Sequence, residues 1–260
     1  MFMNVVVNGL MTNYQKVGSG KVILCLPGWG DTITTFTKLI DELREKYMVL
    51  ALDLPGFGGT QAPSQAWSLE DYADFTADWL KKIKVGKVYA IVGHSYGGAT
   101  AISGVADSRL RCDRLVLLAS AGVRGNKGIQ KSTLRLITKI AKYPTLILPR
   151  RYKNRLRRGL YEAVGSDMLL LPHMEPTFKK IIREDVRQKA KLITTPTLLI
   201  YGSEDDQTPV SDGRLLAEAI PDSYMEIIQG AGHFLHQDDA GQVSRLTKAF
   251  LRKKNDKAPA

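Results

Sequence analysis

The chain has 260 residues, of which 44% are hydrophobic, and a formal net charge of +11. This length allows one sizeable hydrophobic core, so we expect a single domain with an insertion rather than two full domains. Two cysteines are too few for a disulfide framework. The N-terminus has no basic leader region and no apolar run reaches membrane-spanning length, so the sequence predicts a soluble, cytoplasmic protein.

The positive charge is concentrated in one segment. Residues 123–195 hold 18 Lys and Arg against 5 Asp and Glu, whereas the rest of the chain holds 19 against 21. A basic face that binds nucleic acid is normally accompanied by a recognisable reading motif, and none is found here. We therefore expect no nucleic-acid partner.

The predicted elements begin with a hairpin, because two short strands flank Asn8-Gly9. Strands are expected over residues 5–7, 11–17, 21–26, 47–52, 88–92, 115–119, 197–201 and 224–228. Helices are expected over residues 36–43, 68–83, from the turn at 95 to about 107, over 211–219, and at the end through 243–250. Strands that alternate with helices predict an α/β fold, with a mostly parallel sheet covered by helices on both faces.

Residues 123–193 interrupt this alternation with three helix-like pieces and no strand. Apolar stripes lie within 134–141, 152–163 and 178–182, and prolines at 144, 149, 172 and 176 separate them. The first two stripes have Lys and Arg on the opposite face. The expected organisation is a core of residues 1–122 and 194–254, a basic helical insertion over 123–193, and a tail over 255–260.

The strongest motif is the segment Gly93-His94-Ser95-Tyr96-Gly97-Gly98. It ends an apolar run and opens a stretch of small residues typical of a helix start, which is the pattern of a nucleophile elbow. Glycines two positions before and after the serine allow strand and helix to approach closely. The turn would hold the Ser95 hydroxyl in the open, beside the amino end of a helix that stabilises negative charge.

The order of motifs resembles the α/β-hydrolase fold family from about residue 5 to residue 254. The motifs are Leu26-Pro27-Gly28-Trp29-Gly30, Asp53-Leu54-Pro55-Gly56-Phe57-Gly58, the segment around Ser95, Tyr201-Gly202-Ser203-Glu204-Asp205 and Gly230-Ala231-Gly232-His233. The resemblance implies that segment 123–193 is a helical cap, which covers the site and selects what enters.

A serine hydroxyl needs a base to act as a nucleophile at neutral pH. The resemblance implies that His233 is this base and that a carboxylate orients it. Asp205 and Asp206 are both candidates for the carboxylate, and the resemblance favours Asp205, which stands three residues after Gly202 and four before Pro209 as is usual in the family. The order Ser95, Asp205, His233 is that of the family.

The other histidines have structural interpretations. His94 is expected to pack beside the elbow, His173 to lie in the cap, and His236 to lie at the start of the last helix. Asp53 precedes a turn and has no vacant catalytic role, so we interpret it as structural.

By the same resemblance, the oxyanion hole would combine the backbone N–H groups of Trp29 and Tyr96. The sequence departs from the family here, because Pro27 stands where histidine is commonest. The hole uses main-chain groups, so we expect it to survive this change. The Trp29 ring is also expected to pack under the cap.

A serine at position 95 implies acyl transfer through an acyl-enzyme, so the predicted function is a carboxylesterase acting on a small or medium acyl ester. Enzymes that cleave thioesters, lactones or carbon–carbon bonds, or that transfer an acyl group to an alcohol, use the same triad, so these activities stay open. The alternative from another class is a non-catalytic ligand-binding protein of this fold. The scattered histidines and cysteines predict no metal and no cofactor.

The basic insertion carries the only sequence signal about partners. An apolar lining with a positive rim suits an acyl chain joined to an anionic group, and the Gly28-Trp29-Gly30 turn resembles carboxylesterases whose ester is held by an acidic carrier protein. An anionic membrane surface fits equally. A solvated basic face without any partner is the simplest interpretation.

Overall fold

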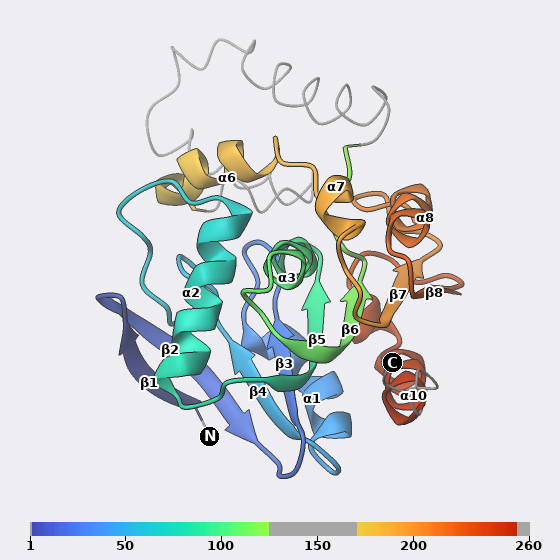
Figure 1. The fold of residues 1–260 in the computed structure, drawn as a ribbon, viewed down its shortest axis with the longest axis horizontal. Helices are drawn as coiled ribbons and strands as arrows, with labels where there is room; N and C mark the ends of the chain where they lie inside the picture. Colours follow the sequence, from blue (N-terminus) through green and yellow to red (C-terminus); the bar gives the residue numbers. More distant parts are fainter. Residues whose placement is uncertain (1, 125–170, 254–260) are drawn as a thin grey trace, which may run out of the picture.

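The computed structural model describes residues 2–124 and 171–253. Within these residues, one eight-stranded sheet has the order β1-β2-β4-β3-β5-β6-β7-β8 (Figure 1). The strands are β1 Phe2–Val7, β2 Leu10–Val17, β3 Val22–Leu26, β4 Met48–Leu52, β5 Val88–His94, β6 Cys112–Leu118, β7 Thr197–Gly202 and β8 Ser223–Ile228. The predicted α/β architecture is confirmed.

The first two strands run against the direction of the rest. Strand β1 pairs antiparallel with β2, and β2 pairs antiparallel with β4, whereas the pairs from β4 through β8 are parallel. Asn8 and Gly9 both have positive φ (49° and 83°), as a tight two-residue hairpin turn requires. The predicted hairpin is confirmed, and it forms one edge of the sheet.

Helices cover both faces of the sheet (Figure 1). They are α1 Thr37–Leu43, α2 Leu69–Lys82, α3 Tyr96–Ala106, α6 Glu175–Ile181, α7 Arg187–Ala190, α8 Val210–Ala219, α9 Leu235–Asp238 and α10 Ala240–Arg252. Two short 3-10 turns, Ile33–Phe36 and Pro172–Met174, lie between these elements.

Alternate residues of the central strands point to opposite faces, as the pleat of a strand requires. In β3, Leu24 and Leu26 enter the hydrophobic cluster that contains the apolar faces of α2 and α3, whereas Ile23 and Cys25 enter the cluster that contains α1 and α10. The central strands are therefore buried on both sides, which explains their continuous apolar runs.

Two helices begin at capping residues that the sequence makes visible. The Ser68 side chain accepts from the N–H of Asp71 while the Asp71 side chain accepts from the N–H of Ser68, a reciprocal capping box at α2. Asp239 caps α10 by accepting from the N–H of Gln242. These bonds fix where both helices start.

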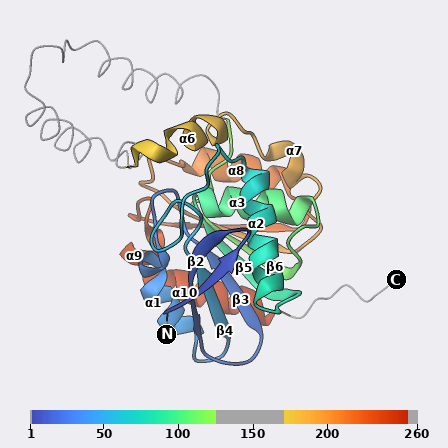
Figure 2. The same cartoon turned by 90° about the vertical axis from the view of Figure 1, so that its left-hand side faces the viewer.

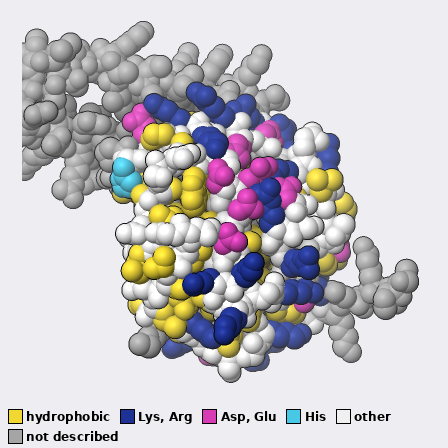
Figure 3. All heavy atoms as spheres, turned by 60° about the vertical axis from the view of Figure 1, so that its left-hand side comes forward, with side chains coloured by type: hydrophobic (Ala, Val, Ile, Leu, Met, Phe, Trp, Pro, Cys, Tyr) yellow, Lys and Arg dark blue, Asp and Glu magenta, His cyan; other side chains and the backbone are white. Residues whose placement is uncertain are grey.

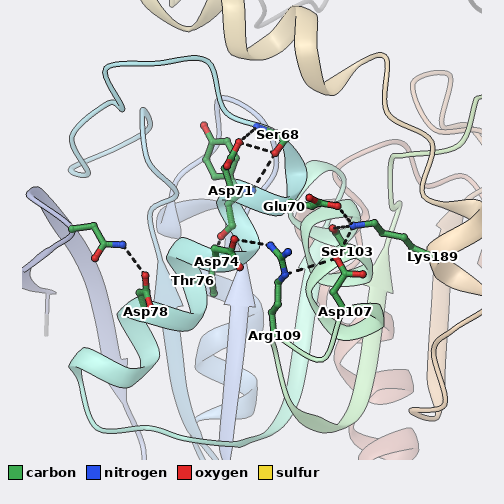
Figure 4. Close-up of polar contacts among 12 residues, drawn as sticks. Ser68, Glu70, Asp71, Asp74, Thr76, Asp78, Ser103, Asp107, Arg109 and Lys189 are labelled. Carbon is green, nitrogen blue, oxygen red and sulfur yellow. Dashed lines mark hydrogen bonds and ion pairs between the residues drawn. The ribbon is translucent and has the colours of Figure 1, made fainter.

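The segment that follows residue 170 returns to the core across the carboxyl ends of the parallel strands (Figure 2). Lys189 of α7 contacts Asp107 (2.6 Å), Glu70 (2.5 Å) and Ser103 (3.0 Å), and this network joins α7 to α2 and α3 (Figure 4). Glu184 accepts from the backbone N–H of Leu69 at the start of α2. Ion pairs and hydrogen bonds therefore hold residues 184–189 on the core.

We expect Lys189→Met to lower the free energy of unfolding by about 1 kcal/mol, because it removes a networked cation from two carboxylates at once. Urea unfolding with a fluorescence readout measures this change. The matched control is Lys179→Met, which removes a solvent-exposed pair with Glu175 and should change the free energy by less than about 0.5 kcal/mol. Equal effects of the two substitutions would contradict a stabilising role for the Lys189 network.

The predicted insertion is described only in part. Its third helical piece is α6, and α7 follows it before β7 begins. The pieces expected over 134–141 and 152–163, like the tail over 255–260, lie outside the described residues. The division into core, cap and tail therefore stays a prediction.

Candidate active site

Ser95 lies on a sharp turn between β5 and α3. Its backbone has φ 49° and ψ −115°, in the region that favours glycine. The N–H of Ser95 donates to the carbonyl oxygen of Leu118 (2.9 Å), and its own carbonyl oxygen accepts from Gly98, Ala99 and Ala121. This strained conformation persists because the neighbouring backbone fixes both sides of it.

The glycines around Ser95 are required by close backbone contacts. A Cβ at Gly93 would lie 2.7 Å from atoms of Gly97 and Gly98, and a Cβ at Gly97 would lie 2.2 Å from the carbonyl oxygen of Leu26. Neither contact is tolerable. The predicted close approach of strand and helix is therefore present, and it also brings the end of β3 against the first turn of α3.

Ser95, His233 and Asp205 form a continuous hydrogen-bonded chain. The Nε2 atom of His233 lies 3.0 Å from the Ser95 hydroxyl, and its Nδ1 lies 2.8 Å from Asp205 Oδ2. A carboxylate accepts only, so Nδ1 carries the proton and Nε2 accepts from the serine hydroxyl. The side chain of Asp205 is fully buried and that of His233 is 8% exposed. The three residues selected from the sequence are thus brought together in the geometry of a nucleophile, a base and an orienting carboxylate.

Asp205 is held as an anion by its neighbours. Burial by itself would raise the pKa of this carboxyl, but hydrogen bonding and charge from His233, together with two bonds from Thr208, lower the pKa below its usual range. The Thr208 hydroxyl lies 2.7 Å from Asp205 Oδ2, and its backbone N–H donates to Oδ1 (2.9 Å). Asp206, the alternative carboxylate, is exposed.

Thr208 was not selected by the sequence analysis. It contacts Asp205, and its hydroxyl also lies 3.2 Å from Nδ1 of His233. A local signal exists, since threonine three residues after an aspartate commonly bonds the aspartate side chain through its amide. That signal marks a turn, however, and does not distinguish a structural turn from one that supports a catalytic carboxylate.

Trp29 and Tyr96 lie side by side above the end of β3. Their rings meet edge to face with centroids 5.5 Å apart, and the Trp29 ring also packs on Phe57 and on Phe178 of α6. Neither backbone N–H donates to another group within the described part of the chain. The oxyanion hole at these two amides stays a prediction, and the Trp29 ring packs against α6 of the returning segment.

Two further histidines lie beside the triad. His94 is 1% exposed, and its Nε2 lies 3.0 Å from the carbonyl oxygen of His233. His236, which the sequence analysis placed at the start of the last helix, instead lies in the separate short helix α9, because Asp239 ends that helix and caps α10. The His236 ring is fully buried, packs on His94 (centroids 4.4 Å apart), and has no hydrogen-bond partner among the described residues.

Burial, and then the positive charge that His94 or His233 can carry, lower the pKa of His236 to about 2. The folded state therefore keeps this ring neutral, while the unfolded chain takes up a proton below about pH 6.5. Stability from this residue is complete above pH 6.5 and is lost as the pH falls toward 2. Wild type should lose free energy of unfolding when the pH falls from 7.5 to 5. We expect His236→Phe to lose about 2 kcal/mol less than wild type over the same interval, as measured by urea unfolding at both pH values. An unchanged pH dependence would contradict a neutral, buried His236.

Asp53 is structural, as predicted. Its Oδ1 accepts from the N–H of Ile33 (2.8 Å), and its Oδ2 accepts from the N–H of Gly59 (2.9 Å) and the side chain of Asn13 (2.6 Å). It thereby joins β2, the first 3-10 turn and the loop after β4. These bonds occupy both oxygens away from Ser95.

A cavity of about 630 Å³ opens beside the loop that carries Trp29. It is lined by Gly30, Asp31, Gly56, Phe57, Gly58, Thr60, Ala62, Leu171 and His173. The lining does not include Ser95 itself, but it begins at the residue after Trp29, whose ring packs on Phe57. This volume lies in the range of small-molecule sites.

A second cavity of about 400 Å³ lies at the carboxyl end of α2 and is lined by Ala77, Leu80, Lys81, Lys84, Val85, Gly86, Arg109 and Arg111. Lys and Arg side chains gather at both ends of this face of the molecule, with acidic side chains between them (Figure 3). Positive side chains are favoured at the carboxyl end of a helix. The helix dipole favours Lys81 at this end of α2, and Arg109 pairs with Asp74 (2.6 Å).

Residues 2–124 and 171–253 hold no helix with the length and apolar character needed to cross a bilayer. They also hold no group of three His, Cys, Asp or Glu side chains arranged to hold a metal ion.

Comparison with known proteins identifies the family. The model of the alpha/beta hydrolase fold matches residues 21–240. An uncharacterized protein of Mycobacterium tuberculosis is 27% identical over 280 residues, which cover 94% of this chain and 79% of that protein. The 2-hydroxy-6-oxo-2,4-heptadienoate hydrolase of Pseudomonas putida is 25% identical over 269 residues, which cover 95% of each. The crystal structure of a bacterial membrane phospholipase A superposes with a TM-score of 0.79 at 22% identity, over 96% of this chain and 85% of that one. The chain belongs to the alpha/beta hydrolase fold family.

Proposed function

We propose that this protein is a serine hydrolase that cleaves a carboxylic ester with a small or medium acyl group through an acyl-enzyme. The observation that supports this most strongly is the hydrogen-bonded chain from Ser95 through His233 to Asp205. The proposed roles are nucleophile for Ser95, general base for His233 and orienting carboxylate for Asp205.

In the first half of the reaction, the Ser95 oxygen attacks the carbonyl carbon of the ester while its proton passes to Nε2 of His233. The carbonyl oxygen becomes an oxyanion, which the N–H groups of Trp29 and Tyr96 stabilise. The carbon–oxygen bond to the alcohol then breaks. The alcohol leaves with the proton from His233, and the acyl group stays on Ser95.

In the second half, His233 takes a proton from water as that water attacks the acyl-enzyme. The same two N–H groups stabilise the second oxyanion. The bond to Ser95 breaks, the serine oxygen regains a proton from His233, and the carboxylic acid departs. An alcohol in place of water would make the same site an acyltransferase.

The cavity beside Trp29 is the proposed place for one arm of the substrate. Its walls include the Phe57 ring and the Leu171 side chain, and its polar groups include Asp31 and Thr60. This mixture suits a neutral group better than a second carboxylate, because Asp31 lies in the wall.

Hydrolysis of a carbon–carbon bond is the second candidate. It is supported by the 25% identity, over nearly the whole of both chains, to a protein named 2-hydroxy-6-oxo-2,4-heptadienoate hydrolase. Thioester and lactone hydrolysis use the same three residues and are tested in the same assay. An acidic carrier protein or an anionic membrane surface stays a proposal for the partner, since most of the basic segment lies outside the described residues.

The test is a set of parallel assays on one preparation. It includes p-nitrophenyl esters from acetate to dodecanoate, an acyl thioester, a lactone, and 2-hydroxy-6-oxo-2,4-heptadienoate. The proposal predicts turnover of the esters with an optimum at a short or medium chain, and that optimum then measures the acyl pocket. Turnover of the heptadienoate at a kcat/KM at least tenfold above every ester would favour the second candidate instead.

A further inference from the structure

His94 holds the backbone on which His233 is carried. Its Nε2 lies 3.0 Å from the carbonyl oxygen of His233, and both groups are buried. A carbonyl oxygen only accepts hydrogen bonds, so Nε2 of His94 carries a proton and donates it. His94, which precedes the proposed nucleophile Ser95, therefore donates a hydrogen bond to the proposed base His233. The bond is to the backbone carbonyl of His233 and does not involve its imidazole ring.

The other nitrogen of His94 faces the loop that carries Trp29. Nδ1 lies 3.4 Å from Oδ2 of Asp31. Both atoms are buried, and neither makes a hydrogen bond within the described residues. The two atoms are the nearest polar groups of the two segments at this point. A Cβ on Gly28 would lie 3.0 Å from Nδ1 and 3.2 Å from Oδ2, so the backbone of this loop closes over the pair.

Three segments thus meet at one imidazole. Asp31 belongs to the loop of the proposed oxyanion donor Trp29, His94 precedes Ser95, and His233 carries the bonded carbonyl. The groups around the His94 ring are Asp31, His233, His236 and Phe234. Of these, Asp31 and the carbonyl of His233 make the polar contacts with the His94 nitrogens, whereas the others pack against the ring.

We propose that His94 is a positioning residue, which together with Asp31 aligns the oxyanion loop, the nucleophile and the catalytic histidine loop with one another. This inference rests on the proposed function and adds residues that take no part in making or breaking bonds. A shift of about 1 Å at reacting groups can lower the rate by about 100-fold. Loss of the His94 donor should therefore lower kcat much more than it raises KM.

His236 provides a matched control. It is a buried histidine in the same ring cluster, 4.4 Å from His94 between centroids, but neither of its nitrogens has a described partner. His236→Phe and His94→Phe each replace a buried imidazole with a phenyl ring. Only the second removes a hydrogen bond to the His233 carbonyl.

The experiment measures kcat and KM on the best p-nitrophenyl ester at pH 8 for His94→Phe, His94→Gln and His236→Phe, together with their thermal midpoints. We expect His94→Phe to lower kcat about 10- to 100-fold with KM changed less than about threefold. We expect His94→Gln, whose amide can donate to the same carbonyl, to recover at least half of that loss on a logarithmic scale. His236→Phe should stay within about twofold of wild type.

A second arm tests the link to Asp31. If the pair acts as one unit, Asp31→Val should lower kcat by a factor similar to that of His94→Phe, and the double variant should lose no more than His94→Phe alone. Independent, multiplying effects would overturn the coupling between the two residues.

The outcomes separate this inference from the proposed function. Wild-type protein that hydrolyses no ester and is not modified at Ser95 by a fluorophosphonate would end the proposed function and with it the basis of this inference. If wild type is active, two results would overturn the positioning role alone. One is a kcat of His94→Phe equal to that of His236→Phe, and the other is a kcat of His94→Gln no higher than that of His94→Phe.

Discussion

Ser95→Ala is expected to lower kcat for ester hydrolysis by about 10⁴- to 10⁶-fold, the range seen when the nucleophile of a triad is removed. Among the residues that the structure describes, the Ser95 hydroxyl is the only group that hydrogen-bonds Nε2 of His233, at 3.0 Å, so no described neighbouring side chain can replace it. Steady-state rates at saturating ester measure the loss. Binding of substrate should change little, because the oxyanion donors are main-chain groups.

The control for this substitution is Ser108→Ala. Ser108 is also a non-glycine residue with positive φ (57°), at the end of α3, and it is exposed. The two variants therefore share the backbone effect of alanine in a left-handed conformation and differ in the hydroxyl. Ser108→Ala should keep wild-type kcat within about twofold. Ester turnover by Ser95→Ala above a hundredth of the wild-type rate would rule out Ser95 as the nucleophile.

Asp205→Asn is expected to lower kcat by about 10⁴-fold, because an amide facing Nδ1 favours the wrong histidine tautomer. In the present geometry Asp205 Oδ2 accepts from Nδ1 at 2.8 Å, which leaves Nε2 free to accept the serine proton. An amide nitrogen at that position would donate to Nδ1 instead, which would place the ring proton on Nε2 and remove its basicity toward Ser95.

Asp206→Asn provides the comparison within the same loop. Asp206 is exposed and adjacent in sequence, so its substitution makes the same change of charge without contact to His233. We expect its kcat within about twofold of wild type in the same assay. A severe loss in Asp206→Asn together with a mild loss in Asp205→Asn would exchange the two roles.

Features with a local physical cause were predictable from the sequence. The elbow could be predicted because Gly93 and Gly97 must lack side chains where strand and helix touch: a Cβ added at either glycine would lie less than 3 Å from neighbouring backbone atoms. The hairpin at Asn8-Gly9 was also predictable from a local cause, because a two-residue turn needs positive φ at both positions and Asn-Gly adopts that conformation readily. The central strands were predictable from apolar runs covered on both faces.

Features that depend on distant parts of the chain were not predictable. The sequence does not indicate which strand of the sheet β2 pairs with. Its antiparallel pairing with β4 could therefore not be predicted from a local pattern. The contact of His94 with the His233 carbonyl joins residues 139 positions apart. The boundary between α9 and α10 was missed because Asp239, with φ −134° and ψ 63°, breaks a run that otherwise has helical spacing.

The site shows the same division. Ser95, Asp205 and His233 were chosen from motif order and spacing, and the fold places them within 3.0 Å of one another along the chain of hydrogen bonds. Thr208 contacts both Asp205 and His233, and Asp31 contacts His94. The Asp31 contact leaves no pattern in the sequence, and the Thr208 pattern marks only a turn, because many polar residues could make such contacts from many positions.

The most direct test of the central claim is covalent labelling with a fluorophosphonate, followed by intact-mass measurement and peptide mapping. The geometry predicts one adduct per chain, located on Ser95, formed by wild type and absent from Ser95→Ala, with labelling slowed in Asp205→Asn. Folded wild-type protein that gains no adduct, while an established serine hydrolase in the same tube is labelled, would contradict a nucleophilic Ser95. The fold would then serve ligand binding rather than hydrolysis.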